Sequence, residues 1–180
     1  MMRKILNFAL FQAGWFAAVL LAAHGRPVAA FLAAGAAVGA NLWLFSSDRA
    51  GDMRILLAVA LIGFSIDTVH LHAGVFALVG APFFPHLCPL WLAGLWALLG
   101  TTLRGSLNWL VGRYVLSALL GAVAGPLSYV GGAKLGAATL PAERTFSLAA
   151  LALGWAVAMP LFIWLAHKSR FLGGAARGVK

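Results

Sequence analysis

One acidic residue, Asp67, is the side chain of this sequence with the clearest capacity for chemistry. The chain has only four acidic residues among its 180, and Asp67 stands inside an apolar run that is long enough to cross a bilayer. It follows Arg54 by thirteen residues, which corresponds to about 20 Å along a helix. A carboxyl group at that depth must be protonated, paired or exposed to water in a cavity. Asp67 is therefore the first candidate for a functional site.

The neighbours of Asp67 repeat at helical spacing. Gly63, Asp67, His70 and Gly74 are separated by four, three and four residues and so share one helix face, which we expect to point into a helix bundle. Asp67 could also do no more than hydrogen-bond to a neighbouring helix, and that alternative stays open. His72 diverges from His70 by about 200° around the helix, so a metal site with three protein ligands is not favoured. We predict no metal ion and no other cofactor.

Further polar residues in the apolar runs complete a candidate intramembrane site. Lys134 is expected to be the basic residue nearest to Asp67, because it follows the fifth apolar run and has a long, flexible stem. The other candidates, most of which should form hydrogen bonds between helices, are Asn7, Gln12, Thr101, Thr102, Ser128 and Tyr129. An enzyme needs at least two convergent ionisable groups, and the sequence offers only Asp67 with Lys134. No known catalytic motif is present.

These residues must be positioned by membrane-spanning helices. A spanning helix needs roughly 20 apolar residues to cross a hydrocarbon layer of about 30 Å, and 63% of this sequence is hydrophobic whereas 9% is charged. The sequence predicts a single all-α domain over residues 1–180, a polytopic bundle of about six transmembrane helices. Their expected ranges are 5–23, 27–45, 53–73, 89–103, 107 or 113 to 129, and 146–166. Gly125 and Pro126 are expected to break the fifth helix well before Lys134, so that residues 125–136 form either a kinked helix end or part of a cavity wall.

The distribution of Lys and Arg predicts the orientation. Ten of the thirteen basic residues lie on the side of the N-terminus if the runs alternate across the membrane, which favours cytoplasmic locations for both termini. Arg104 and Arg113 should mark that boundary. Basic residues flank the apolar runs, so the expected partner is the lipid bilayer and not nucleic acid. The first run could also be a secretory signal peptide, but Asn7 and Gln12 interrupt it and favour a retained helix.

Motifs along most of the chain are shared with a known family. The sequence resembles DUF2878, a family of small bacterial membrane proteins of unknown function, in the segments Pro89–Leu92, Leu95-Trp96, Thr101–Leu103, Ser106-Leu107, Trp109-Leu110, Gly125–Tyr129 and Ala133–Gly136, and at Asn7, Phe11, Gln12, Gly14, Trp15, Gly63, Asp67 and Gly74. It departs from the family pattern at Arg104-Gly105, where an Asn-His pair is usual, and at the two histidines of the third run.

The resemblance implies a bacterial inner-membrane location and, because family members are often encoded beside enzymes that modify membrane fatty acids, lipid-modifying enzymes as partners. We therefore expect a protein that binds or moves a small molecule or lipid in support of membrane-lipid modification. Two alternatives remain at this stage. One is an integral membrane enzyme that acts on lipid with Asp67 as proton donor or acceptor, and the other is a structural partner subunit.

Overall fold

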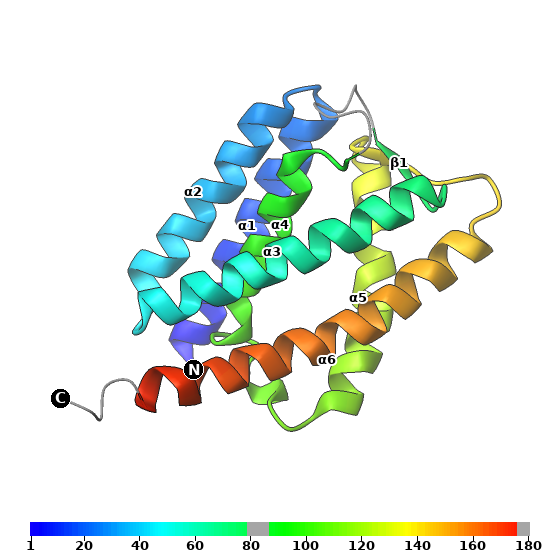
Figure 1. Ribbon diagram of the computed structural model, residues 1–180. Helices are drawn as coiled ribbons and strands as arrows, with labels where there is room; N and C mark the ends of the chain where they lie inside the picture. Colours follow the sequence, from blue (N-terminus) through cyan, green and yellow to red (C-terminus); the bar gives the residue numbers. More distant parts are fainter. Residues whose placement is uncertain (79–86, 176–180) are drawn as a thin grey trace.

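The computed structural model describes residues 1–78 and 87–175 of the chain as a bundle of α-helices (Figure 1). The helices in these ranges are α1 (Met2–Ala23), α2 (Pro27–Phe45), α3 (Arg49–His72), α4 (Leu90–Leu103), α5 (Tyr114–Lys134) and α6 (Thr145–Ala175). A short 3₁₀ helix, Asn108–Leu110, precedes α5. The predicted all-α class is confirmed, and the residue ranges expected from the apolar runs match the helices to within a few residues at most ends.

Two short strands, which the sequence analysis did not anticipate, link the loops after α3 and α5. Strand β1 (Ala77–Leu78) pairs antiparallel with β2 (Ala138–Thr139), with Ala77 opposite Thr139 and Leu78 opposite Ala138. The two helices that precede these strands are thereby joined at one end of the bundle.

Local capping explains why α3 begins earlier than expected. The carboxylate of Asp48 accepts a hydrogen bond from the backbone N–H of Gly51 at 3.2 Å, so Asp48 satisfies one of the free donors of the first helical turn. The helix therefore starts at Arg49 and not at Met53. Pro27 occupies the first turn of α2, where its missing N–H leaves no hydrogen bond unmade.

Helix α4 differs from the other helices in length and burial. Five helices of the described chain are long and apolar enough to cross a membrane, whereas α4 has 14 residues. Fourteen residues extend about 21 Å, less than the thickness of the hydrocarbon layer. Helix α4 packs against α1, α2, α3 and α6, so it occupies the centre of the bundle. Protein surrounds it, and the irregular backbone that follows Leu103 is therefore tolerable at membrane depth.

The length of helix α5 differs from the expectation. The helix is continuous through Gly125 and Pro126 up to Lys134, so the predicted break before Lys134 was wrong. Proline removes one backbone donor, but transmembrane helices tolerate this loss where neighbouring helices pack against the segment. Helix α5 packs along α6, and the hydroxyl of Ser128 donates to the carbonyl oxygen of Gly125 at 2.7 Å.

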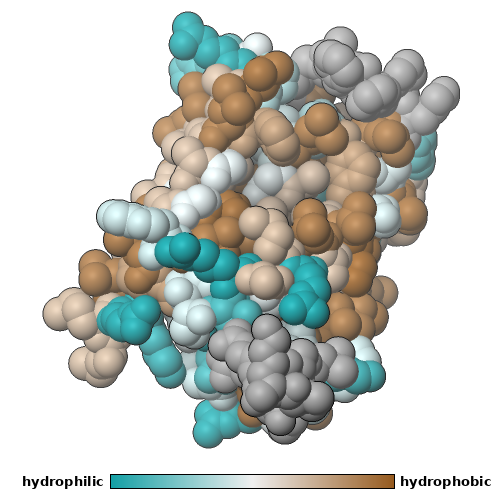
Figure 2. All heavy atoms as spheres, turned by 60° about the vertical axis from the view of Figure 1, so that its left-hand side comes forward, coloured by the Kyte–Doolittle hydropathy of each residue, from teal (hydrophilic) through white to brown (hydrophobic). Residues whose placement is uncertain are grey.

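The arrangement of the helices agrees with a bundle that sits across a bilayer. In Figure 1, α3 and α6 run alongside one another, and α1 begins at the end of the bundle where α6 ends. Helix α6 has 31 residues, about 46 Å, so it must tilt or extend beyond the hydrocarbon layer. Figure 2 shows hydrophobic side chains over most of one face, with hydrophilic ones gathered at its lower part and upper edge. Which side of the membrane holds the termini stays a prediction.

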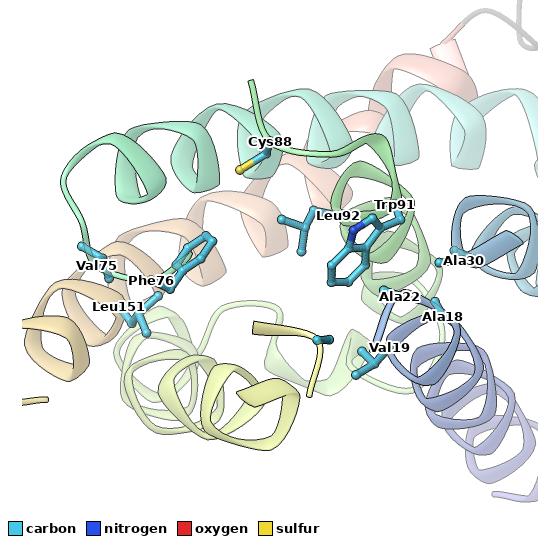
Figure 3. Packing of buried hydrophobic residues seen from close by; sticks show 12 residues of the cluster. Ala18, Val19, Ala22, Ala30, Val75, Phe76, Cys88, Trp91, Leu92 and Leu151 are labelled. Atoms are coloured by element: carbon cyan, nitrogen blue, oxygen red, sulfur yellow. The ribbon is translucent and has the colours of Figure 1, made fainter. Parts of the chain in front are cut away.

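Two groups of buried apolar residues fill the bundle. The strand-end cluster includes Val75, Phe76, Trp91 and Leu151, and Figure 3 shows Val75, Phe76 and Leu151 on one side of it with Trp91 on the other. The terminus-end cluster lies between α3, α4 and α6 and consists of Ile55, Val59, Trp96, Leu99, Leu103, Leu110, Ala158, Met159, Phe162, Ile163 and Ala166. Polar chemistry must therefore occupy the space left around and between these clusters.

Candidate functional site: an apolar cavity with one carboxylate

Asp67 lies at the point where α3, α4 and α5 meet. Its side chain is buried, with 1% of the residue exposed. The indole N–H of Trp96 donates to Asp67 Oδ2 at 2.7 Å, and the hydroxyl of Tyr129 donates to Asp67 Oδ1. Each carboxylate oxygen thus accepts a hydrogen bond from a different helix. The expected inward face of α3 is correct for Gly63, Asp67 and His70, which are buried, whereas Gly74 follows the end of the helix at His72 and is exposed.

Two glycines allow this arrangement. Gly63 lies one turn before Asp67, and a Cβ atom added there would overlap the indole ring of Trp96. Gly125 lies one turn before Tyr129, and a Cβ atom there would overlap Trp155 in the same way. The two indoles stack between the helices with ring centroids 4.6 Å apart. Each glycine therefore makes room for one tryptophan and brings a polar side chain, four residues further on, to the same place.

Sequence reasoning did not identify Trp96 and Trp155 as parts of the site. A tryptophan in a transmembrane segment commonly belongs to the interfacial belt or to the packed interior, so its type alone carries little information. The repeated spacing of a glycine four residues before a polar residue, on α3 and again on α5, is the signal that could have pointed to this pair.

A cavity of about 560 Å³ extends from Asp67 between α1 and α5. Apolar and aromatic side chains form most of its wall, and Asp67 is the only charged residue among the described residues that line it. The lining comprises Phe8, Phe11, Gln12, Trp15, Asp67, Leu92, Leu95, Trp96, Leu99, Leu107, Leu110, Leu120, Gly121, Val123, Ala124, Leu127, Ser128, Tyr129, Trp155 and Met159.

Helix packing explains where the cavity opens. Helix α1 packs mainly on α2 and α4, while α5 packs mainly on α6, so α1 and α5 form the two sides of the cavity. They approach each other near Trp15, where a Cβ atom on Gly131 would lie 3.5 Å from the indole. The lining residues Phe8, Val123 and Leu127 are 45%, 60% and 63% exposed. These residues belong to helices that are long enough to span the membrane, so the opening faces the hydrocarbon layer.

The structure brings four of the predicted site residues together. Asp67, Gln12, Ser128 and Tyr129 all line the cavity. His70 does not, although it is buried on the same face of α3. Its ring packs against α6, where a Cβ atom on Gly154 would lie 2.8 Å from His70 Cε1, and it bonds the backbone of Ala150.

The predicted pairing of Asp67 with Lys134 is absent from the described residues. The ion pairs found there join Arg104 to Asp48 and Asp52, and Lys134 is exposed. Five residues separate Lys134 from Tyr129 in an unbroken helix, which turns its side chain about 140° away from the one that reaches Asp67. The expected pairing assumed that the helix ended earlier, and the nearest basic residue to Asp67 stays a prediction.

Asn7 and its hydrogen-bond partners Asn41, Thr101 and Ser106 form a separate group near the other end of the bundle, which we call the Asn7 knot. The Asn7 side chain, 2% exposed, donates to Asn41 Oδ1 at 2.8 Å and to the carbonyl oxygen of Thr101 at 3.2 Å, and it accepts from the N–H of Ser106 at 2.9 Å. The hydroxyl of Thr102 donates to the carbonyl oxygen of Leu99 at 2.6 Å. None of these side chains lines the cavity.

Arg104 forms ion pairs at the start of α3, and its role in marking the membrane boundary stays a prediction. Its guanidinium lies 2.7 Å from Asp52 and 3.3 Å from Asp48, and the hydroxyl of Ser46 donates to Asp52. With 12% of its side chain exposed, Arg104 fixes the end of α4 to the start of α3. Within residues 1–78 and 87–175, no group of three or more His, Cys, Asp or Glu residues is placed to hold a metal ion.

The fold and the cavity define a polytopic helical membrane protein with a ligand-sized apolar cavity between its helices. A family model described as a protein of unknown function, DUF2878, matches residues 4–161. The match covers most of the 180 residues, so the chain belongs to this family. No curated protein and no solved structure matches the chain at a significant level.

Proposed function

We propose that this protein binds an amphiphilic molecule taken from the bilayer in the cavity between α1 and α5. The observation that carries the proposal is a cavity of about 560 Å³, within the size range of small-molecule sites, with apolar walls and one carboxylate. Its opening toward lipid gives an apolar chain direct access. A molecule with a hydrocarbon chain and one polar end matches this distribution of surface.

The hydrogen bonds of Asp67 leave room for such a polar end. A carboxylate offers about four acceptor positions, and Trp96 and Tyr129 occupy one on each oxygen. A donor on the ligand would use the positions that remain. The Gln12 amide and the Ser128 hydroxyl provide further polar contacts on the cavity wall.

The role in the cell that we propose is support of membrane-lipid modification, by holding a lipid or lipid-like molecule within reach of a modifying enzyme. The lipid-facing opening supports this role. If the protein has this role, cells that lack the gene will have an altered lipid profile, and complementation with the normal chain will restore it. An unaltered profile in the deletion strain would remove the support for this pathway.

The alternative of a lipid-acting enzyme gains one specific observation. The Tyr129 hydroxyl is bonded to Asp67 and lies beside the Trp155 indole, so two ionisable groups converge at the cavity, as acid–base chemistry requires. An enzyme would consume a bound lipid, whereas a binding protein would return it unchanged. Mass spectrometry of lipids extracted after incubation with the purified protein separates these outcomes.

A photoreactive probe tests binding directly. The full-length protein in phosphatidylcholine nanodiscs would be irradiated with a diazirine-bearing hexadecanol, and labelled peptides mapped by mass spectrometry. We expect labels on cavity residues of α1 and α5.

Two matched tryptophan variants of α5 control for surface labelling. Ala124→Trp places a large side chain on the cavity wall, and Val115→Trp places the same side chain at a 77% exposed position that does not line the cavity. We expect at least a tenfold loss of cavity labelling in Ala124→Trp and none in Val115→Trp. Equal labelling of the two variants would exclude the cavity as the binding site.

A further inference from the structure

The charges around the cavity are unbalanced. Asp67 is the only acidic residue in the described lining, and no lysine, arginine or histidine of the described chain belongs to it. Two basic residues could in principle neutralise Asp67, but neither lines the cavity. Arg104 forms ion pairs with Asp48 and Asp52, and the side chain of Lys134 is exposed. The described protein therefore supplies the Asp67 carboxyl group with neutral hydrogen-bond donors and with no counter-charge, so its ionised form gains a charged partner only when a cation binds in the cavity.

From this imbalance we infer that the cavity is selective for amphiphiles with a cationic end, of the primary alkylammonium class, over neutral ones and strongly over anionic ones. The inference rests on the proposed function and names the class of ligand that the same cavity takes. An ammonium group donates hydrogen bonds to the free acceptor positions of Asp67 and at the same time provides the missing positive charge.

The aromatic residues around Asp67 favour the same class. Trp15, Trp96, Trp155 and Tyr129 all line the cavity, and a cation near the face of such rings is attracted by their quadrupoles. An aromatic wall with one carboxylate is a common way to hold an organic cation. A mostly apolar wall strengthens this attraction relative to bulk water, because electrostatic interactions are less screened in a medium of low polarity.

The same features disfavour an anionic end. A carboxylate, sulfate or phosphate group would be placed next to Asp67 with no basic residue of the described lining to separate the two charges. A neutral alcohol can donate one hydrogen bond to Asp67 but brings no charge. The expected order of affinity is therefore ammonium first, alcohol second and anion last.

Competition between three molecules with the same chain measures this order. Dodecylammonium, dodecanol and dodecyl sulfate would each compete with the diazirine-bearing hexadecanol for the full-length protein in phosphatidylcholine nanodiscs at pH 7, at equal mole fractions in the bilayer. We expect half-maximal competition by dodecylammonium at a mole fraction at least tenfold below that of dodecanol, and no competition by dodecyl sulfate.

Two variants assign the order to Asp67. In Asp67→Asn the advantage of dodecylammonium over dodecanol should shrink to less than threefold, while labelling by the hexadecanol probe continues and shows that the cavity still forms. Glu143→Gln removes another acidic residue, which lies outside the cavity lining, and should keep the full order.

Each outcome of the competition has a distinct meaning. Equal competition by all three molecules, or preference for dodecyl sulfate, would overturn the charge selectivity and leave binding of an amphiphile intact. An unchanged tenfold preference in Asp67→Asn would show that another group selects the cation. Absence of cavity labelling by the probe in the normal protein would refute the proposed function and this inference together.

Discussion

The Asn7 knot and the Asp67 site are both built from buried polar side chains between membrane-spanning helices, and they differ in what surrounds them. In the knot, Asn7 forms hydrogen bonds with Asn41, Thr101 and Ser106 and borders no cavity. At the second site, Asp67 accepts two hydrogen bonds and also faces a cavity. Adjacent empty space thus distinguishes the two groups: the Asn7 knot connects helices, and Asp67 borders the cavity for which we propose ligand binding.

The largest effect is expected from Gly63→Ala. The added methyl group would overlap the rigid indole of Trp96, which is held by Asp67 and by the stacked Trp155, so the change should destabilise the protein by about 3 kcal/mol, the upper end for overpacking. It should also abolish cavity labelling. Thermal unfolding in nanodiscs measures the stability. Gly35→Ala, where no atom lies within 4 Å of the added group, is the matched control and should leave both properties intact.

The next largest effect is expected from Asn7→Leu. The variant leaves Ser106 N–H, the Thr101 carbonyl and Asn41 without their partner, which should cost about 1–3 kcal/mol of stability. Gln12→Leu, five residues along the same helix, changes a cavity residue and should cost much less. If Gln12→Leu destabilised the protein as much as Asn7→Leu, the proposed difference between the Asn7 knot, which connects helices, and the cavity residues would be wrong.

A smaller loss of stability is expected from Asp67→Asn. The amide keeps the shape of the side chain but can accept only on one atom, so one of the hydrogen bonds from Trp96 and Tyr129 is lost. Hydrogen bonds between membrane helices contribute about 0.6 kcal/mol on average, and the amount of protein in the membrane should stay nearly normal. Failure of this variant to restore the lipid profile of a deletion strain, at normal protein level, would support a role for the acidic group. Full restoration would instead assign Asp67 to helix packing.

The smallest effect is expected from Ser128→Ala. The hydroxyl bonds a carbonyl oxygen of its own helix at 2.7 Å, and such a local bond can be replaced by a small backbone adjustment. We expect a change in stability below about 0.5 kcal/mol and a less than threefold change in probe competition. A tenfold change in competition would show that Ser128 contacts the ligand directly.

Runs of apolar residues predicted most of the fold, and the failures of prediction have physical causes. Helix ranges follow from runs of apolar residues, so α2 was predicted to the residue. The continuity of α5 through Pro126 depends on the packing of α6, which no local pattern reveals. The ion pair of Arg104 with Asp52 joins residues 52 positions apart, and two-residue strands have too little sequence to carry a signal.

The candidate site was also predictable in part from the sequence. Asp67 was recognisable because an acidic residue in an apolar run is unusual. The sequence also held a signal that Asn7 and Asp67 belong to different sites, because Asn7 follows the basic residue Lys4 by three positions and Asp67 follows Arg54 by thirteen, which places them at different depths. The expectation that Lys134 pairs with Asp67 depended on a helix end that the structure places further along the chain, at Lys134 itself.

The strand pair β1–β2 bears on how the cavity can change its width. Helix α3, which carries Asp67, leads into β1, and α5, which carries Tyr129, leads into β2. The paired strands therefore hold these two helix ends together. We therefore expect a wider ligand to displace α5 from α1 mainly near Tyr114, away from the strands, while the Asp67 carboxyl group and the Tyr129 phenol stay together near the strand pair.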